Sequence, residues 1–356
     1  MRGAAKAGLD WPRFLEIARR HRVEGLVHDG LARAGIEPPP PVAGALRDAA
    51  TSITVENLRY AAESGRLARA FDRAGIAALF LKGLTLNILA YGTLAIKKSA
   101  DLDLVIEPGA LDRTIDLMEG LGYGCVTPAP GASREEILAW TSRAKDTLWL
   151  RHGLAVEIHH GFVDSPLMLP GVTVASPRQT VRVAPGVELP TLAKEELFAY
   201  LCVHGATHAW SRLKWIADVA ALLGGESGAE VERLHRRAVA IGAGRATAQA
   251  LLLSAELFAL PLGAELRREL QGDRAVRYLA RAAMATMLQG DGLAEPGDSA
   301  LGTAAIHLSH FRLMPGWRFK AAELRRKLGS IEGEGAMAPL LAAPRWLLRR
   351  ASPRRW

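Results

Sequence analysis

The chain has 356 residues, of which 49% are hydrophobic, 23% charged and 6% aromatic, and its formal net charge is +8 at pH 7. The hydrophobic share excludes a largely disordered chain, and two cysteines are too few for a disulfide framework or a four-thiolate zinc site. The first residues lack the apolar core of a signal peptide, and no apolar run is long enough to cross a bilayer. We therefore expect a cytoplasmic protein of two or three domains.

The basic surplus favours an anionic ligand, such as a nucleotide, an RNA or a lipid headgroup. The 36 arginines are spread along the chain, except in the basic and aromatic segment 345–356. A nucleic-acid partner is therefore possible but not favoured. We expect the segment 345–356 to be a solvated terminus, with contact to a membrane surface or to RNA as the alternative.

Residues 1–75 are predicted to form an N-terminal helical segment. An amphipathic pattern starts at Trp11 and continues to Leu31. The prolines at 38–41 end it, because proline lacks the amide donor and clashes inside a helix. A long helix is then expected over 42–74, with a glycine after it as the C-terminal cap.

Residues 76–190 predict a small α/β domain with a mixed sheet. Apolar or alternating runs predict four strands, at 77–81, 101–106, 147–151 and 155–159. The last two flank a glycine-containing turn and are expected to form a hairpin. Helices are expected over 84–90 and from Pro108 onward.

Residues 191–356 are predicted to form a C-terminal helical domain. Thr191, followed by two glutamates, is expected to cap a helix that continues to Leu223. Further helices are expected over 228–241, 244–259, 263–290 and 318–328. Together these elements predict an α+β protein, in which a small mixed-sheet domain is flanked by N-terminal and C-terminal helical segments.

Two aspartates on the strand 101–106 are the strongest chemical signal in the sequence. Asp101 and Asp103 point to the same face of a strand, where they repel each other unless a cation lies between them. Mg²⁺ is commonly bound by one or two carboxylates together with substrate phosphates. Glu157, on the strand 155–159, can supply the third carboxylate of a two-metal phosphoryl-transfer site. The alternative is a pair of aspartates on a solvated strand face.

A second group of polar residues forms one stripe along the expected helix 191–223. The rest of that helix is apolar and therefore buried, so the stripe must face a cleft or internal partners. In the first case we expect contacts to an acceptor or to phosphates from His204, His208, Lys214 and Asp218. In the second, the histidines are hydrogen-bonded inside the protein. His159 lies two residues after Glu157, on the same strand face, and is expected to make the same kind of contact.

Several segments of the chain together carry a resemblance to a known family. They are Phe80-Leu81-Lys82-Gly83, Tyr91, Asp101-Leu102-Asp103-Leu104-Val105, Gly122-Tyr123, Val156-Glu157-Ile158-His159 and the stretch from Val203 to Asp218. With the N-terminal helices they span roughly residues 10–225. This set resembles the bacterial nucleotidyltransferase family proteins, distant members of the polymerase-beta-type nucleotidyltransferase superfamily.

The resemblance implies roles for individual residues. Asp101 and Asp103 would hold the metal ions, expected to be two Mg²⁺, and Glu157 would be the third acid, which orients the acceptor hydroxyl. The expected nucleotide contacts are Lys82, Gly83, Lys97 and Ser99. Several positions depart from the family's pattern. Leu84 stands where a serine is usual, and Lys97 replaces an arginine, which keeps the charge but loses the bidentate fork. Ala100 stands where glycine is frequent, and His160 where an aromatic residue is usual.

We therefore expect a magnesium-dependent nucleotidyltransferase. It would move a nucleoside monophosphate from an NTP, expected to be ATP, to a hydroxyl or phosphate acceptor and release pyrophosphate. One alternative is a non-catalytic nucleotide-binding protein on the same fold, in line with the departures at Leu84 and Lys97. The other is a phosphotransferase that acts on a peptide or natural product. The acceptor stays open between a small molecule, a sugar, an RNA end and a protein hydroxyl.

Overall fold

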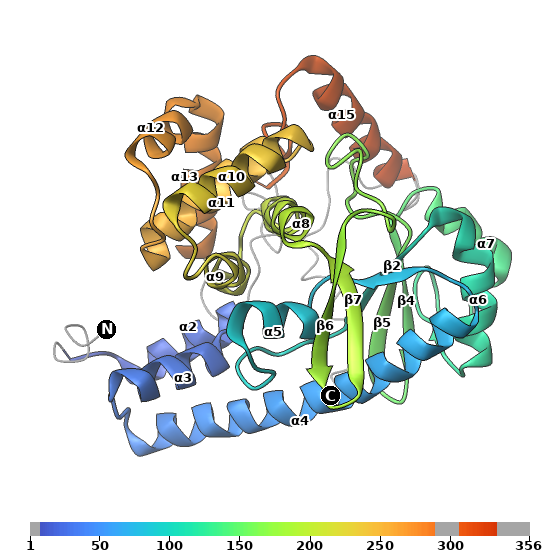
Figure 1. Ribbon diagram of the computed structural model, residues 1–356, viewed down its shortest axis with the longest axis horizontal. Helices are drawn as coiled ribbons and strands as arrows, with labels where there is room; N and C mark the ends of the chain where they lie inside the picture. Colours follow the sequence, from blue (N-terminus) through green and yellow to red (C-terminus); the bar gives the residue numbers. More distant parts are fainter. Residues whose placement is uncertain (1–7, 289–305, 333–356) are drawn as a thin grey trace.

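The computed structural model describes residues 8–288 and 306–332, and these form an α+β fold (Figure 1). Three helices come first: α2 (Trp11–His21), α3 (Glu24–Ala34) and α4 (Pro40–Arg73). Pro40 and Pro41 occupy the first turn of α4, where a missing amide donor costs nothing, so the helix starts before the predicted position. The long α4 runs beneath the rest of the molecule in Figure 1.

A mixed five-stranded sheet forms the centre of the fold, with the strand order β1-β2-β5-β4-β3. β2 pairs in parallel with β5, whereas β1 with β2 and β4 with β5 are antiparallel. The mixed sheet and the predicted hairpin are therefore confirmed. The strands are β1 (Ala78–Phe80), β2 (Leu102–Ile106), β3 (Gly124–Cys125), β4 (Asp146–Arg151) and β5 (Leu154–His159).

Helices and a second hairpin connect and cover this sheet. The helical elements are α5 (Leu84–Tyr91), η1 (Pro108–Ala110), α6 (Leu111–Gly120) and α7 (Arg134–Thr141). The second hairpin consists of β6 (Arg178–Ala184) and β7 (Val187–Leu192), which pair with each other. The prediction that Thr191 caps a helix is wrong, because Thr191 lies in β7. Val181 and Val183 of β6 and Leu189 of β7 pack into the same core as residues of α4.

The C-terminal part is helical, as predicted. Its helices are α8 (Lys194–Thr207), α9 (Leu213–Leu222), α10 (Gly228–Ala240), α11 (Gly244–Phe258), α12 (Ala264–Gly272), α13 (Arg274–Leu288) and α15 (Trp317–Glu332). The helices α9 to α13 gather at the upper left of Figure 1, whereas α15 lies at the upper right. The helix predicted over 263–290 is divided at Asp273, whose backbone is extended. The basic segment 345–356 lies outside the described residues. Within the described ranges, no helix is both long enough and apolar enough to span a membrane.

Two apolar cores lie on opposite faces of the sheet. Because side chains alternate along β2, Val105 joins the core that contains α8, α9 and α11, while Leu104 joins the core that contains α4 and α6. Asp103 shares the face of Val105. The alternation therefore directs Asp103 toward the helices α8 and α9.

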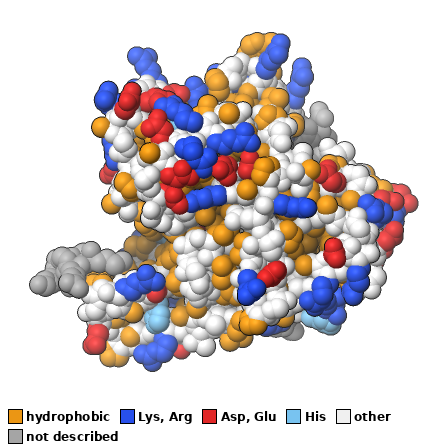
Figure 2. Space-filling model, in the orientation of Figure 1, with side chains coloured by type: hydrophobic (Ala, Val, Ile, Leu, Met, Phe, Trp, Pro, Cys, Tyr) orange, Lys and Arg blue, Asp and Glu red, His pale blue; other side chains and the backbone are white. Residues whose placement is uncertain are grey.

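Basic and acidic side chains are interspersed on the face of the molecule drawn in Figure 2. Over α10 and α12, arginines form ion pairs with glutamates of the same or neighbouring helices, as Arg233 does with Glu195 and Arg236 with Glu269. The basic surplus seen in the sequence is thus partly balanced locally on this face.

A sharp reversal separates α8 from α9, so the prediction of one continuous helix over 191–223 is wrong. Ala209 and Trp210 have φ values of 48° and 51°, in the left-handed region that non-glycine residues rarely adopt. The indole of Trp210 is fully buried and packs against Gly205. A Cβ atom at Gly205 would lie 2.3 Å from the indole. The absence of a side chain at Gly205 therefore allows the chain to fold back.

Replacing Gly205 with alanine tests this reversal. The added methyl group must displace the Trp210 ring, and overpacking of this kind costs about 1–3 kcal/mol of unfolding free energy. Gly44→Ala is the matched control, because a Cβ at that helical position of α4 meets open space. The control is expected to be neutral or slightly stabilising. Equal stability of the two variants in urea denaturation would contradict the proposed packing.

Candidate active site

A cavity of about 280 Å³ lies between the strands β2 and β5 on one side and the helices α8 and α9 on the other. All twelve residues that the sequence analysis selected as site residues line it: Lys82, Gly83, Lys97, Ser99, Asp101, Asp103, Glu157, His159, His204, His208, Lys214 and Asp218. The fold thus brings together residues from β1 to α9, while their individual roles stay predictions.

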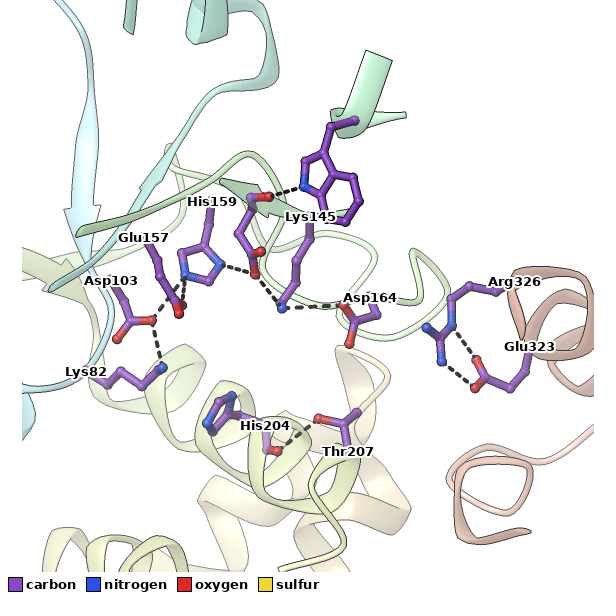
Figure 3. Close-up of polar contacts among 12 residues, drawn as sticks. Lys82, Asp103, Lys145, Glu157, His159, Asp164, His204, Thr207, Glu323 and Arg326 are labelled. Atoms are coloured by element: carbon purple, nitrogen blue, oxygen red, sulfur yellow. Dashed lines mark hydrogen bonds and ion pairs between the residues drawn. The ribbon is translucent and has the colours of Figure 1, made fainter. Parts of the chain in front are cut away.

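Two carboxylates and one imidazole converge at the strand side of the cavity (Figure 3). The parallel register places Asp103 beside Glu157, and His159 follows on the same face of β5. One ligand atom from each of Asp103, Glu157 and His159 lies within 4.8 Å of the other two. This group is the one set of three or more metal-ligating side chains found among the described residues.

Asp103 is the most deeply buried of these groups and is surrounded by positive charge. Its Oδ1 lies 2.7 Å from Lys82 Nζ and 3.1 Å from His159 Nε2. Burial opposes ionisation, but Lys82 and His159 outweigh it and hold the pKa of Asp103 well below its usual range. Burial also disfavours the imidazolium, yet hydrogen bonds with Asp103 and Glu157 raise the pKa of His159 to about 9. Lys82 and an imidazolium therefore balance the carboxylates.

Asp101 lines the same cavity but lies just before β2, and it is not part of the converging group. Burial, followed by repulsion from Asp103, raises the pKa of Asp101 to about 6. A carboxylate in this position is destabilised as long as no further cation approaches it. The environment of Asp101 therefore favours a bound cation. In the converging group, however, His159 occupies the place that was expected for Asp101.

The turn between β1 and α5 brings backbone to the edge of the cavity. Gly83 has a φ of 66° and a ψ of −118°, a conformation that favours glycine. No side chain caps the N-terminus of α5, which begins directly after Gly83. A Cβ at Gly83 would lie 3.4 Å from Ser99 Oγ, and this hydroxyl is buried without a hydrogen-bond partner among the described residues.

Lys97 and Asp218, both expected to contact ligand, form a buried ion pair with each other. Lys97 Nζ lies 2.6 Å from Asp218 Oδ2, and the Tyr91 hydroxyl donates to Asp218 Oδ1 at 2.8 Å. The pair joins α9 to α5 and to the segment before β2. Both side chains still line the cavity, so the pair also contributes to its wall.

The helix side of the cavity consists of aromatic rings and one lysine. His208 stacks on Trp215, and the ring centroid of His204 lies 4.7 Å from that of His208. Within the described residues neither imidazole has a hydrogen-bond partner, in contrast to the alternative of internally bonded histidines. Burial and then Lys82 lower the pKa of both, which favours their neutral forms. Burial and then Lys97 lower the pKa of Lys214 to about 7.

Four charged lining residues were missed by the sequence analysis: Arg22, Lys98, Lys145 and Asp146. The register pairs Asp146 with His159, and Lys145 lies 2.8 Å from Asp146. The predicted strand 147–151 begins one residue too late. Had it begun at Asp146, the hairpin register would have placed Asp146 opposite His159 and so near the site. Arg22 reaches the cavity from the turn after α2, for which the sequence pattern contains no signal.

The fold and the site define a class of protein: an α+β chain whose central strands present carboxylates to a cavity that also contains lysines. Comparison with protein families agrees with this class. A family model described as uncharacterised nucleotidyltransferase matches residues 7–259, and the chain belongs to this family. The resemblance stated from the sequence is therefore confirmed, and membership supports nucleotidyl transfer with a nucleotide substrate. A search of curated proteins found no match.

The buried pair of Lys97 and Asp218 leads to a stability prediction. Lys97→Met leaves the Asp218 carboxylate buried without its counter-charge, which typically costs about 3–5 kcal/mol. The neighbouring Lys98→Met is the control, because the half-exposed Lys98 pairs with Glu56 near the surface and such pairs contribute at most about 1 kcal/mol. Denaturant unfolding of both variants tests the difference. A similar loss in both would show that the Lys97 pair has no special structural role.

Proposed function

We propose that the protein is a magnesium-dependent nucleotidyltransferase that moves a nucleoside monophosphate from an NTP, expected to be ATP, to a hydroxyl or phosphate acceptor. The observation that carries the proposal is the convergence of Asp103 and Glu157 from neighbouring parallel strands, with Asp101 beside them in one cavity. Family membership supports the class of reaction.

The residues of the site fit a divalent cation. Asp103 Oδ2 is buried and has no hydrogen-bond partner among the described residues, so it has lone pairs available for an ion. The raised pKa of Asp101 points the same way, because a cation would relieve the repulsion from Asp103. Held by Asp101, Asp103 and Glu157, two Mg²⁺ ions would supply activation of the acceptor hydroxyl and stabilisation of the leaving pyrophosphate.

The β1–α5 turn is the proposed site of the triphosphate. The N-terminus of α5 offers unpaired amide groups and the positive end of a helix dipole. Lys82 adds a positive charge at the same turn. Ser99 Oγ can compensate for the departure at Leu84, because it places a hydroxyl without a hydrogen-bond partner among the described residues beside Gly83, one residue before Leu84.

The helix side of the cavity is the proposed acceptor side. The neutral imidazoles of His204 and His208 can accept a hydrogen bond from an acceptor hydroxyl and so orient it toward the transferred phosphate. Lys214 offers a positive charge beside them, for a phosphate of either the acceptor or the nucleotide. The ion pair of Lys97 with Asp218 keeps this wall in place relative to the nucleotide side.

Asp101→Asn tests transfer directly. Loss of one anionic ligand weakens the electrostatic stabilisation of the transferring phosphate, and we expect a 10²–10³-fold loss of magnesium-dependent pyrophosphate release. The melting temperature should be preserved or raised, because the substitution relieves repulsion from Asp103. Asp48→Asn, on the exposed face of α4, is the control and should change neither quantity. If wild-type protein releases no pyrophosphate across a broad acceptor panel but binds NTP, the non-catalytic alternative is favoured.

The lowered pKa of Lys214 predicts that nucleotide affinity depends on pH. Lys214 is positively charged below about pH 7 and loses its charge as the pH rises above that value, so the affinity for anionic NTP should fall. Lys214→Arg stays charged and should remove this part of the dependence, about 1 kcal/mol or fivefold in Kd. Calorimetric titration at pH 6.2 and 8.2 measures the change, and the nucleotide's own titration is common to both proteins. Identical pH profiles would exclude Lys214 from the nucleotide site.

A further inference from the structure

The imidazole of His159 lies between the two carboxylates of the converging group. Its Nε2 atom is 3.1 Å from Asp103 Oδ1 and 3.2 Å from Glu157 Oε2. Adjacent ligands of an octahedral ion with bonds of about 2.1 Å are about 3.0 Å apart. His159 Nε2 therefore already has the spacing of a neighbouring corner of a coordination sphere relative to each carboxylate oxygen, and all three residues offer ligand atoms within 4.8 Å of one another (Figure 3).

The other ring nitrogen of His159 also has the environment typical of a metal-bound histidine. Nδ1 is buried without a hydrogen-bond partner among the described residues and lies 3.7 Å from Asp146 Oδ2. The β4–β5 register places Asp146 directly opposite His159, and Lys145 holds the Asp146 carboxylate at 2.8 Å. Histidines that bind metals commonly donate their second N–H to a carboxylate, which fixes the ring and makes the ligating nitrogen more basic.

We propose that His159 is itself a metal ligand, so that Asp103, Glu157 and His159 form a two-carboxylate, one-imidazole site that binds Mn²⁺ more tightly than Mg²⁺. The inference rests on the proposed metal-dependent function and assigns His159 to the ion instead of to the acceptor. A nitrogen ligand favours first-row transition-metal ions, whereas Mg²⁺ prefers oxygen ligands alone. Binding of the ion displaces the proton that Nε2 shares with the carboxylates, and Asp146 then supports the ring from behind as a positioning residue.

Pulsed electron paramagnetic resonance of Mn²⁺ bound to the full chain tests the proposal without an activity measurement. A directly bound imidazole gives a ¹⁴N modulation of the Mn²⁺ signal, and labelling the protein with ¹⁵N-histidine must change it. This second measurement needs no variant, and it also excludes a nitrogen supplied by a nucleotide analogue. In calorimetry, wild-type protein should bind Mn²⁺ more tightly than Mg²⁺.

Variants then assign the nitrogen to one residue. His159→Gln should remove the ¹⁴N signal and weaken Mn²⁺ binding by about 10–100-fold, with a smaller effect on Mg²⁺. Asp146→Asn should keep the signal but lower the affinity. His160→Gln is the matched control, because His160 bonds to the Thr141 carbonyl, outside the cluster, and should change neither readout.

The outcomes separate this inference from the proposed function. Mn²⁺ binding without any histidine-derived modulation, or with equal Mn²⁺ affinity in wild type and His159→Gln, overturns the ligand assignment and leaves the transferase proposal intact. A wild type that binds neither Mn²⁺ nor Mg²⁺, with or without a nucleotide analogue, overturns both.

Discussion

The buried negative charge of Asp103 is the constraint on which the site depends. A carboxylate removed from water must be paired, and Lys82 and His159 provide the pairing from two different elements. The requirement fixes the turn after β1, the start of β2 and the end of β5 relative to one another. The same requirement explains why a polar cluster is tolerated next to an apolar core that contains Val105 and α8.

The wall opposite the carboxylates has a different physical basis. It is held by ring contacts among His204, His208 and Trp215 and by the ion pair of Lys97 with Asp218. One side of the cavity thus contains compensated charge, and the other contains neutral rings and a lysine. This asymmetry suits a reaction between a strongly anionic donor and a polar acceptor, because each reactant meets a surface of matching chemistry.

Much of this arrangement could be predicted from the sequence, because periodicity reveals which side chains share a face. The alternation in β2 and β5 predicted both strands and the shared face of Asp103, Glu157 and His159. Tertiary contacts explain the errors. The break between α8 and α9 depends on Trp210 packing against Gly205, and the β6–β7 hairpin depends on a core shared with α4, so neither follows from local pattern. Asp146 was missed because its significance lies in its pairing with β5.

The two sides of the cavity differ in the length of chain that must be ordered to build them. The corner formed by Gly205 and Trp210 joins residues five positions apart, so the turn between α8 and α9 needs little loop closure. The carboxylate side joins Asp103 to Glu157 across about 50 residues in a parallel pairing. Contacts of such long range carry a larger entropy cost of loop closure and slow the folding of a chain. The carboxylates of the site therefore come together only when a loop of about 50 residues closes.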